Sequence, residues 1–354
     1  MNFYKGKRVL LTGHTGFKGS WMTKLLLHMG AQVLGYSTCR ERSPSLFQLS
    51  GAEKEITHVK GDVRDYGHLL EVFSSFRPEI VFHLAAQPIV RESYANPRTT
   101  YETNVMGTVN VLECIRQTKS VKSAIIVTTD KVYRNEEHRS YREGDVLDGF
   151  DPYSNSKSCA ELATASYRRS FADLPSISTV RAGNVIGGGD FAKDRIIPDC
   201  VRAMQKGEPV NVRNPHSVRP YQHVLEPLAA YLLIAEKQYE NPSLAGCYNI
   251  GPEESDCVTT GELVELFCKK WGDGARWVDG SEPNAPHEAG LLKLDCGLVK
   301  QVCGWKPRWN LEECMELVCR FENLRLSNGD AAAEMEREIK RFLYDREERW
   351  ILQS

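Results

Sequence analysis

The stretch RVLLTGHTGFKG, residues 8–19, decides the fold of this chain. Its apolar run Arg8–Thr12 predicts a buried strand, three glycines follow with GxxGxxG spacing, and Gly19–Met29 predicts an amphipathic helix. In that order the first glycine permits a tight turn, the second lets a pyrophosphate approach the backbone, and the third lets helix and strand pack closely. The helix then directs unpaired N–H groups at the anion. We therefore predict a dinucleotide-binding loop formed by Gly13, His14, Thr15, Gly16, Phe17, Lys18 and Gly19. A purely structural turn is the alternative.

Strand and helix patterns alternate outward from this loop. Apolar runs predict strands at Ala31–Tyr36, Thr57–Asp62, Ile80–Ala85, Ser123–Thr128 and Ser178–Ala182. Helical patterns fall between them, at Tyr66–Phe76, around Arg98–Thr118 and at Tyr153–Phe171. Strands separated by helices of this length are typical of βαβ units. The predicted fold class is α/β, with a Rossmann-type, doubly wound and mainly parallel sheet.

The pattern weakens after about Gly187, where glycine and proline become frequent. We expect a smaller mixed α/β C-terminal region there that binds the substrate. The predicted dinucleotide-binding domain spans 1–186, with returning segments near 215–250, and the substrate region spans 187–325. Residues 326–354 should form a charged C-terminal helix, because Ala331–Gln353 mixes charges of both signs with spaced apolar residues. Alternating signs favour a solvated structural helix over a nucleic-acid arm.

Composition excludes several classes of function. The chain has 354 residues, 45 basic and 47 acidic, and its formal net charge of -2 gives no general attraction to nucleic acid or to anionic membranes. The eleven cysteines include no CxxC pair, which indicates reduced thiols and no metal site. The longest apolar stretch, Leu228–Ala235, is far below the roughly 20 residues that span a bilayer. The N-terminus has no secretory pattern. We expect a soluble cytoplasmic protein.

Tyr153 and Lys157 form a YxxxK pair near the start of a predicted helix. Their i, i+4 spacing places both side chains on one helical face. A tyrosine ordinarily has a pKa of about 10, which is too high for a base at neutral pH. An adjacent ammonium and a positively charged nicotinamide both favour the phenolate and lower that pKa. The pair therefore predicts a catalytic base beside a bound dinucleotide.

A second polar cluster, Thr129-Asp130-Lys131, follows the predicted strand Ser123–Thr128. Polar residues at the carboxyl end of a strand in an open α/β sheet face the ligand crevice. Thr129 can hydrogen-bond a sugar hydroxyl, Asp130 can act as an acid, and Lys131 can act as a base if it is partly desolvated. A salt-bridged Asp–Lys turn is the alternative, and it would be preferred if the tyrosine pair were absent.

Other strand ends are expected to line the same crevice. The candidate cofactor contacts are Asp62, Val63, Leu84, Ala85, Ala86 and Asn104. For His83 alone, the default interpretation is a histidine that is buried and hydrogen-bonded in the core. Its position in register with the other strand ends favours a cofactor contact instead. No carboxylate ends the second strand to hold the ribose hydroxyls; Cys39 stands there, and Arg40 or Arg42 could hold a 2′-phosphate or lie solvated in a loop. NAD and NADP both stay open on this evidence.

Several longer motifs resemble the extended short-chain dehydrogenase/reductase superfamily. They are TGHTGFKG, HLAAQ, TNVMGT, TTDK, YSNSK and VRAGNVIGGGDFAKDRIIPD. Within the superfamily they are most similar to the nucleotide-sugar dehydratases that act on CDP-glucose, and the resemblance runs from about Lys7 to Asn310. Lys131 distinguishes this chain from the other nucleotide-sugar dehydratases, because the dTDP-glucose and GDP-mannose dehydratases carry Asp-Glu where this chain has Asp-Lys. Two features depart from the family: Cys39 replaces a common Asp, and Val132–Asn135 (VYRN) replaces a common Cys-Tyr-Asp-Asn.

The resemblance implies a 4,6-dehydratase reaction with NAD as cofactor. Tyr153 would take the proton from the 4-hydroxyl, with Lys157 holding the ribose and Thr129 orienting the hydroxyl, while hydride leaves carbon 4. Lys131 would then remove the carbon-5 proton, directly or through water, and Asp130 would protonate the departing 6-hydroxyl. Return of the hydride to carbon 6 gives CDP-4-keto-6-deoxyglucose. The net reaction is a dehydration and needs no external redox partner.

The resemblance also implies substrate contacts and partners. The candidate substrate residues are Gln87, Asn184, Arg195, Arg213, Arg219, His287 and Glu288. For Arg213 a surface salt bridge is an equal alternative. A homodimer through a four-helix bundle, built from the helices near 98–118 and 153–171, is implied, as is a place in the synthesis of deoxysugars of bacterial surface polysaccharides. The alternatives are another nucleotide-sugar 4,6-dehydratase or a 4-epimerase acting on UDP-, dTDP- or GDP-sugars, and a non-catalytic dinucleotide-sensing regulator.

Overall fold

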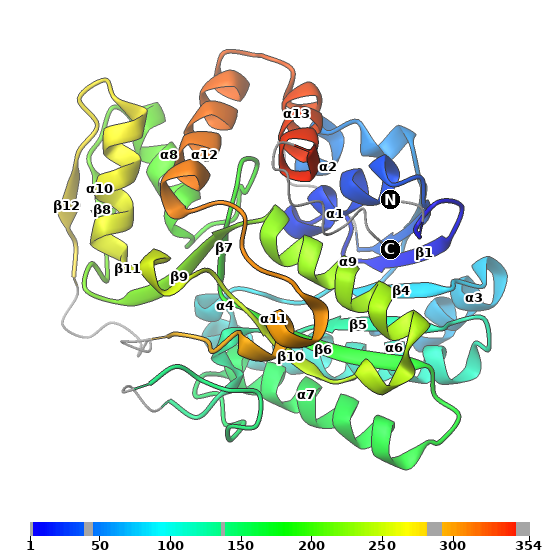
Figure 1. The fold of residues 1–354 in the computed structure, drawn as a ribbon. Helices are drawn as coiled ribbons and strands as arrows, with labels where there is room; N and C mark the ends of the chain where they lie inside the picture. Colours follow the sequence, from blue (N-terminus) through cyan, green and yellow to red (C-terminus); the bar gives the residue numbers. More distant parts are fainter. Residues whose placement is uncertain (1–2, 39–44, 136–138, 282–291, 345–354) are drawn as a thin grey trace.

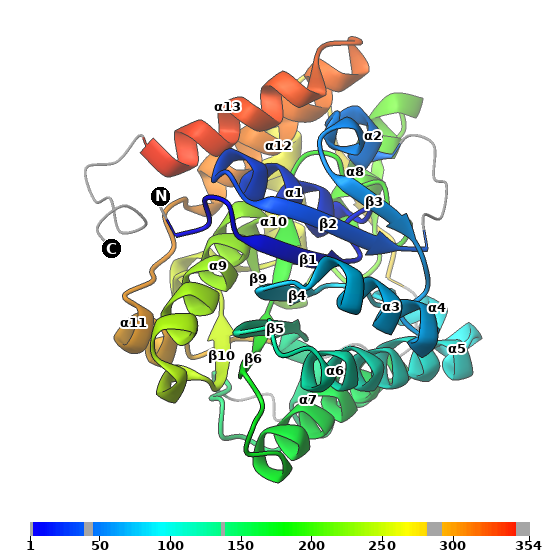
Figure 2. The ribbon, with the colours of Figure 1, turned by 90° about the vertical axis from the view of Figure 1, so that its right-hand side faces the viewer.

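Seven parallel strands form the central sheet, in the order β10–β6–β5–β4–β1–β2–β3 (Figures 1 and 2). The computed structural model describes residues 3–38, 45–135, 139–281 and 292–344. The strands are β1 Arg8–Thr12, β2 Gln32–Ser37, β3 Thr57–Lys60, β4 Ile80–His83, β5 Ser123–Val127, β6 Ser176–Ala182 and β10 Cys247–Ile250. The order is that of the doubly wound nucleotide-binding fold, in which ligands bind at the switch between β1 and β4. The predicted fold class is confirmed.

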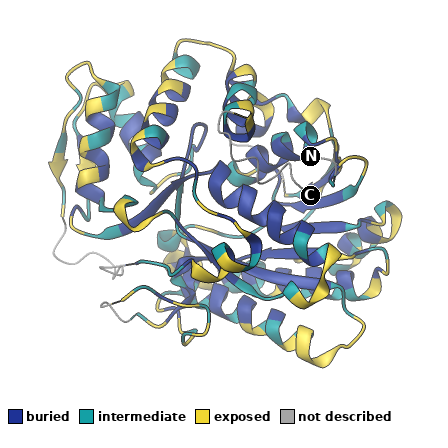
Figure 3. Ribbon diagram, in the orientation of Figure 1, coloured by how far each residue is buried: buried dark blue, intermediate teal, exposed yellow. Residues whose placement is uncertain are grey.

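Helices cover both faces of this sheet (Figure 2). Successive side chains of a strand point to opposite faces. Val9 and Leu11 accordingly pack in the core shared with α1 (Phe17–His28) and α9 (Leu225–Glu240), whereas Leu10 packs in the core shared with α3 and α6. The apolar run inside α9 is therefore part of a buried core helix, and Figure 3 shows it and the strands at the centre of the large sheet as buried.

The sheet face opposite α9 is covered by α3 (Tyr66–Phe76), α6 (Gly107–Gln117) and α7 (Pro152–Ser170). Asp151 caps α7 by accepting a hydrogen bond from the Ser154 N–H at 3.0 Å, which fixes where the helix begins. Short helices complete this half of the chain: α2 Leu46–Leu49, α4 Val90–Ala95 and α5 Pro97–Tyr101.

Most predicted elements of the first half are present, with ends that differ by one or two residues. The strand Arg8–Thr12 and the helix at 66–76 match the prediction. The helical stretch expected around 98–118 is present, but it is not a uniform α-helix, because a π-helical turn, Glu102–Met106, joins α5 to α6. A π turn has an extra residue and is frequent at functional sites, and this one carries Asn104.

The second half of the chain adds two small sheets beside the carboxyl edge of the large one. One has the order β11–β9–β7 and the other pairs β12 with β8. Their strands are β7 Asn184–Ile186, β8 Val210–Val212, β9 Val218–His223, β11 Cys257–Thr259 and β12 Trp277–Asp279. The accompanying helices are α8 Ile196–Lys206, α10 Thr260–Trp271, α11 Gly297–Cys303, α12 Leu311–Leu326 and α13 Ala331–Tyr344. Between them, α9 and β10 return to the large sheet. The boundaries at 186 and 325 stay a prediction.

Helix α13 lies across α1 and α12 and buries Met335, Ile339, Phe342 and Leu343. The rest of the predicted C-terminal helix, 345–353, lies outside the described residues. Beneath α13, Glu338 faces His223 of β9 at 3.3 Å, with both side chains fully buried. Within the described ranges, the structure has no helix with the length and apolar character that crossing a bilayer requires.

Candidate active site

The three glycines of the loop after β1 have different steric surroundings. Gly13 has φ +75°, and a Cβ there would lie 2.7 Å from the Ala85 N. A Cβ on Gly19 would lie 2.2 Å from the Gly13 O. A Cβ on Gly16 would meet only that oxygen, at 3.4 Å, and Gly16 is the N-cap of α1, where no side chain satisfies the helix N–H groups. The loop thus leaves an open cradle at the N-terminus of α1, toward which the first backbone N–H groups of the helix point, and this fits a pyrophosphate.

The His14 side chain belongs to the protein interior. Its Nε2 hydrogen-bonds the His58 Nδ1 at 2.6 Å, and its ring fills the space above Gly35. Burial, and then the neighbouring His58, lower the pKa of His14 to about 3, so the ring is neutral. Only the backbone of His14 is therefore left for a cofactor contact.

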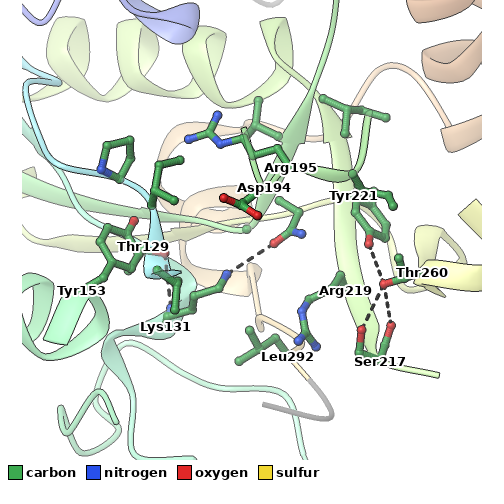
Figure 4. Close-up of a pocket in the computed structure, with 18 of the residues that line it drawn as sticks. Thr129, Lys131, Tyr153, Asp194, Arg195, Ser217, Arg219, Tyr221, Thr260 and Leu292 are labelled. Carbon is green, nitrogen blue, oxygen red and sulfur yellow. Dashed lines mark hydrogen bonds between the residues drawn. The ribbon is translucent and has the colours of Figure 1, made fainter. Parts of the chain in front are cut away.

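Tyr153, Thr129 and Lys131 line one cavity of about 310 Å³. Figure 4 shows them on one side of it, with Ser217, Arg219, Tyr221 and Thr260 on the other. Burial raises the pKa of Tyr153 to about 12, assisted by Asp130, while a hydrogen bond with Thr129 and the charge of Arg195 oppose the rise. Without ligands the phenol is therefore protonated at neutral pH.

Lys157 lies one turn after Tyr153 and is buried. Its ammonium donates to the Val127 O, at the end of β5, at 2.9 Å. Burial lowers the pKa of Lys157 to about 8, and the neighbouring Glu161 carboxylate opposes the shift. The Lys157 ammonium therefore lies at the end of β5, just before Thr129 in the chain.

Asp130 and Lys131 form the expected ion pair. The Lys131 Nζ lies 2.8 Å from the Asp130 Oδ1, which also accepts from Thr129 at 2.9 Å, and 3.4 Å from the Asn184 Oδ1. The Asp130 carboxyl is buried, and its Oδ2 has no hydrogen-bond partner among the described residues. The salt-bridged turn, which was the alternative interpretation, and the polar cluster beside Tyr153 are thus the same structure. The Asp130 Oδ2 can still accept a hydrogen bond from a further partner.

The loop after β4 is held by side chains that were expected to contact ligands. The Asn104 Oδ1 accepts from the Gln87 N–H at 2.8 Å, and its Nδ2 donates to the Gln87 O and to Ser156. Gln87 itself bonds the Ile89 backbone and Thr100. Both side chains therefore shape the loop that contains Leu84, Ala85 and Ala86 and tie it to α7. Their predicted ligand contacts stay predictions.

His83 is a core histidine, and the expected shift toward a cofactor contact is not supported. Its Nδ1 bonds Thr12 at 2.7 Å and its Nε2 bonds Thr108 at 3.2 Å. Burial, and then Lys157, lower its pKa to about 3. After β3, Asp62 pairs with Arg64 at 2.6 Å and Val63 is buried. The residues Cys39, Arg40, Glu41 and Arg42 lie outside the described residues.

The predicted substrate arginines lie along the cavity. Arg195 pairs with Asp190 at 3.0 Å, and Arg213 pairs with Asp194 at 2.7 Å. The salt-bridge alternative for Arg213 is therefore present, and its substrate contact stays a prediction. Arg219 is buried, and Asn184 lines the same space. The other two substrate candidates, His287 and Glu288, lie outside the described residues. No cluster of three His, Cys, Asp or Glu side chains suited to a metal ion occurs in the described part of the chain.

Sequence reasoning missed part of the lining. Thr260 bonds Ser217 and Tyr221, both at 3.0 Å. Ser217, just before β9, and Arg219 and Tyr221 within it alternate along the chain, and this period of two could have identified the face of β9 that lines the cavity. The Lys18 side chain also lines the cavity, and burial, followed by the charge of Arg195, lowers its pKa to about 7.

Comparison with known proteins agrees with this geometry. The family described as GDP-mannose 4,6 dehydratase matches residues 10–318. The CDP-glucose 4,6-dehydratase of Salmonella typhimurium is 44% identical, covering 97% of this chain and 98% of that protein. The UDP-glucose 4-epimerase of Thermus thermophilus in complex with NAD has a TM-score of 0.78 and 26% identity, covering 89% of this chain and 99% of that one.

The UDP-glucose 4-epimerase of Stenotrophomonas maltophilia, solved with NAD and formylated UDP-arabinopyranose, has a TM-score of 0.80 over 91% of this chain and 100% of that one. At 21% identity it shows the fold alone. The family match and the 44% identical relative are decisive. This chain belongs to the nucleotide-sugar 4,6-dehydratase family of the extended short-chain dehydrogenase/reductases.

Proposed function

We propose that this chain is an NAD-dependent hydro-lyase that converts CDP-D-glucose to CDP-4-dehydro-6-deoxy-D-glucose. One observation carries the proposal: Thr129, Lys131 and Tyr153 line a single cavity that the phosphate loop also reaches through Lys18. The Asp-Lys sequence at 130–131 and the 44% identical CDP-glucose dehydratase support the substrate class. The fit of the glycine cradle to a pyrophosphate supports the cofactor.

Tyr153 accepts the proton of the sugar's 4-hydroxyl, which Thr129 orients. The phenolate forms when the pKa of Tyr153 falls from about 12. The Lys157 ammonium on the same helical face and a positive nicotinamide both favour that charge. The glycine loop of residues 13–19 would hold NAD, whose nicotinamide would supply the hydride acceptor for carbon 4 and the hydride donor for carbon 6.

Asp130 and Lys131 carry out the elimination as a pair. Across their 2.8 Å contact, one proton passes from the Lys131 ammonium to the Asp130 carboxylate, which leaves a neutral amine and a carboxylic acid. The amine then takes the carbon-5 proton, which the carbon-4 ketone has acidified, and the acid protonates the departing 6-hydroxyl. Loss of water from around an ion pair favours its neutral form. A sugar that fills the cavity therefore promotes the transfer.

Cations around the cavity support binding of the substrate's diphosphate. Arg195, Arg213 and Arg219 line it together with Asn184, and guanidinium groups suit bidentate phosphate contacts. Gln87, whose side chain shapes the adjoining loop, His287 and Glu288 complete the proposed substrate set.

We also propose a cytoplasmic homodimer formed through the helices near 98–118 and 153–171. Met106 and Leu162 support this interface because these two apolar residues are 51% and 55% exposed. The near-neutral charge supports a small-molecule partner over nucleic acid or membrane. The product belongs to the deoxysugar precursors of bacterial surface polysaccharides such as O-antigen.

The test is turnover of CDP-glucose with catalytic NAD⁺, followed by the ultraviolet chromophore that 4-keto-6-deoxy sugars give in base. We expect product from CDP-glucose and little from UDP-, dTDP- or GDP-sugars in parallel reactions. Tyr153→Phe is the negative control. Turnover of another nucleotide sugar alone would overturn the substrate, a 4-epimer as sole product would identify an epimerase, and no turnover of any sugar would leave a dinucleotide-binding regulator.

A further inference from the structure

A buried polar network lies against the proposed active site, and two of its members, Thr128 and Tyr133, also line the cavity. The centre of the network is Glu161 on α7, one turn after Lys157 and two turns after Tyr153. The carboxylate is 3% exposed and accepts from four donors: the Thr128 Oγ1 at 2.5 Å, the Thr179 Oγ1 at 2.7 Å, and the Arg181 Nε and Nη2 at 2.9 and 2.8 Å. Every acceptor site of this carboxylate is therefore used within the protein.

The network continues from Arg181 to Tyr133. The Arg181 Nη1 donates to the Tyr133 Oη at 2.7 Å and to the Glu143 O at 2.9 Å. The Tyr133 hydroxyl donates in turn to the Asn249 Oδ1 at 2.5 Å, in β10. The ring of Tyr133 stacks on Tyr141, with centroids 4.9 Å apart and planes 4° from parallel. Both the ring and the hydroxyl are therefore fixed.

Thr128 and Tyr133 stand on either side of the segment that carries Thr129, Asp130 and Lys131. Glu161 holds Thr128, directly before this segment, and Arg181 holds Tyr133, two residues after it. Ser158, also on α7, donates to the Val132 O at 2.8 Å, within the same turn. One buried unit thus joins the helix of the oxidation residues to both ends of the elimination turn.

We infer that Glu161, Arg181 and Tyr133 are positioning residues that set the distance between the Tyr153–Lys157 pair and the Asp130–Lys131 pair. The inference rests on the proposed function, because it assigns the two pairs to successive steps on one hexose. We name these three residues with Thr128 the Glu161 clamp. None of its members donates or accepts a proton in the reaction.

The electrostatics of the clamp agree with a positioning role. Apolar residues of similar volume often stabilise a core as well as a buried ion pair does, whereas an ion pair with directional hydrogen bonds fixes one geometry. Removing one charged partner would leave the other charge buried without a partner. A Glu161 or Arg181 variant would therefore misfold and could not test the positioning role. The informative variants delete a hydroxyl from the ends of the clamp.

Tyr133→Phe and Thr128→Val are those variants. The first keeps the stack on Tyr141 and loses the bonds to Arg181 and Asn249, and the second keeps the side-chain shape and loses the bond to Glu161. Displacement of a catalytic group by about 1 Å can cost about 100-fold in rate. Since the clamp holds the turn and leaves Tyr153 on its own capped helix, elimination should slow more than oxidation.

The matched control is Ser178→Ala. Ser178 lies on β6, as Arg181 does, but its hydrogen bonds go to Gln238 and to the Gly246 N–H, away from the elimination turn. The variant Ser178→Ala therefore loses a buried hydroxyl, as the clamp variants do, and should lose a similar amount of folding stability. It leaves the clamp intact.

The experiment measures two quantities with CDP-glucose: the fraction of enzyme-bound cofactor that is reduced at steady state, and the kinetic isotope effect on kcat with deuterium at carbon 4. For both clamp variants we expect the rate constant of elimination to fall at least tenfold relative to that of oxidation. Reduced cofactor should then accumulate on the enzyme, and the isotope effect on kcat should approach one. Ser178→Ala should match wild type in both. If the clamp variants fold, turn over and partition as Ser178→Ala does, the positioning role is wrong. If wild-type protein does not dehydrate CDP-glucose, the proposed function fails instead.

Discussion

Gly16→Ala should separate cofactor binding from folding. The backbone at Gly16 has φ −76°, which any L-residue adopts, and the added Cβ would touch only the Gly13 O, at 3.4 Å. The unfolding free energy should therefore fall by about 1 kcal/mol or less, the usual cost of alanine at an N-cap. The new methyl group nevertheless fills the cradle in front of α1. Overpacking of about 1–3 kcal/mol there would weaken NAD binding by roughly 5- to 150-fold.

Gly19→Ala should have the opposite effect, because it should destabilise the fold itself. Its Cβ would lie 2.2 Å from the Gly13 O and 2.6 Å from the His14 Cα, so the backbone itself must move. We expect about 1–3 kcal/mol of destabilisation, or more, without any ligand. Gly144→Ala is the control, because a Cβ there has nothing within 4 Å.

The assay combines urea unfolding of the cofactor-free variants with calorimetric titration of NAD. Gly16→Ala should unfold within about 1 kcal/mol of wild type and bind NAD weakly, Gly19→Ala should unfold early, and Gly144→Ala should match wild type in both. Wild-type NAD affinity for Gly16→Ala would refute the assignment of this cradle to the pyrophosphate. Destabilisation equal to that of Gly19→Ala would refute the steric reasoning.

Three further predictions concern the cavity and α13. Lys131→Met should lower dehydration by about 10²- to 10⁴-fold through loss of the base, while carbon-4 oxidation persists as reduced-cofactor absorbance; unchanged dehydration would exclude the role. The pKa of Lys18 falls from 10.5 to about 7 on folding, so the unfolded chain binds more protons between these values and stability rises with pH there. Lys18→Met should remove that slope and unfold at a higher temperature than wild type below about pH 7, as scanning calorimetry would show; an unchanged slope counts against the buried ammonium. Phe342→Ala should cost about 3–5 kcal/mol in urea unfolding because the ring is buried against Trp309, whereas Val278→Ala, on an exposed position, should cost less than about 1; a loss for Phe342→Ala as small as that of Val278→Ala would show that α13 contributes little.

The sequence predicted the parts of this molecule that depend on local pattern. Buried parallel strands are continuous apolar runs, so Arg8–Thr12 could be located to the residue. Strands such as Val210–Val212 are three residues long and pair with segments far away in the chain, so no local periodicity marks them. Their existence depends on tertiary pairing.

Site residues divide in the same way. Backbone roles and fixed spacings, as in the glycine loop and the Tyr153–Lys157 pair, are visible in a sequence because they are local. How Asn104 and His14 use their side chains depends on which distant groups reach them. Asn104 meets the Gln87 backbone and Ser156, and His14 meets His58. Residue type alone cannot distinguish such a support from a ligand contact.

The π-helical turn at 102–106 makes the chain sensitive to its own length. An α-helix advances about 100° per residue, so the extra residue rotates everything before it relative to everything after it. Deleting Met106 would give one regular helix from α5 to α6, which is locally more stable. That helix would carry the Asn104 amide to another side and detach the loop after β4 from α7. A chain shortened at this turn would therefore keep its local helix and lose its crevice, so the number of residues in the turn matters as well as their identity.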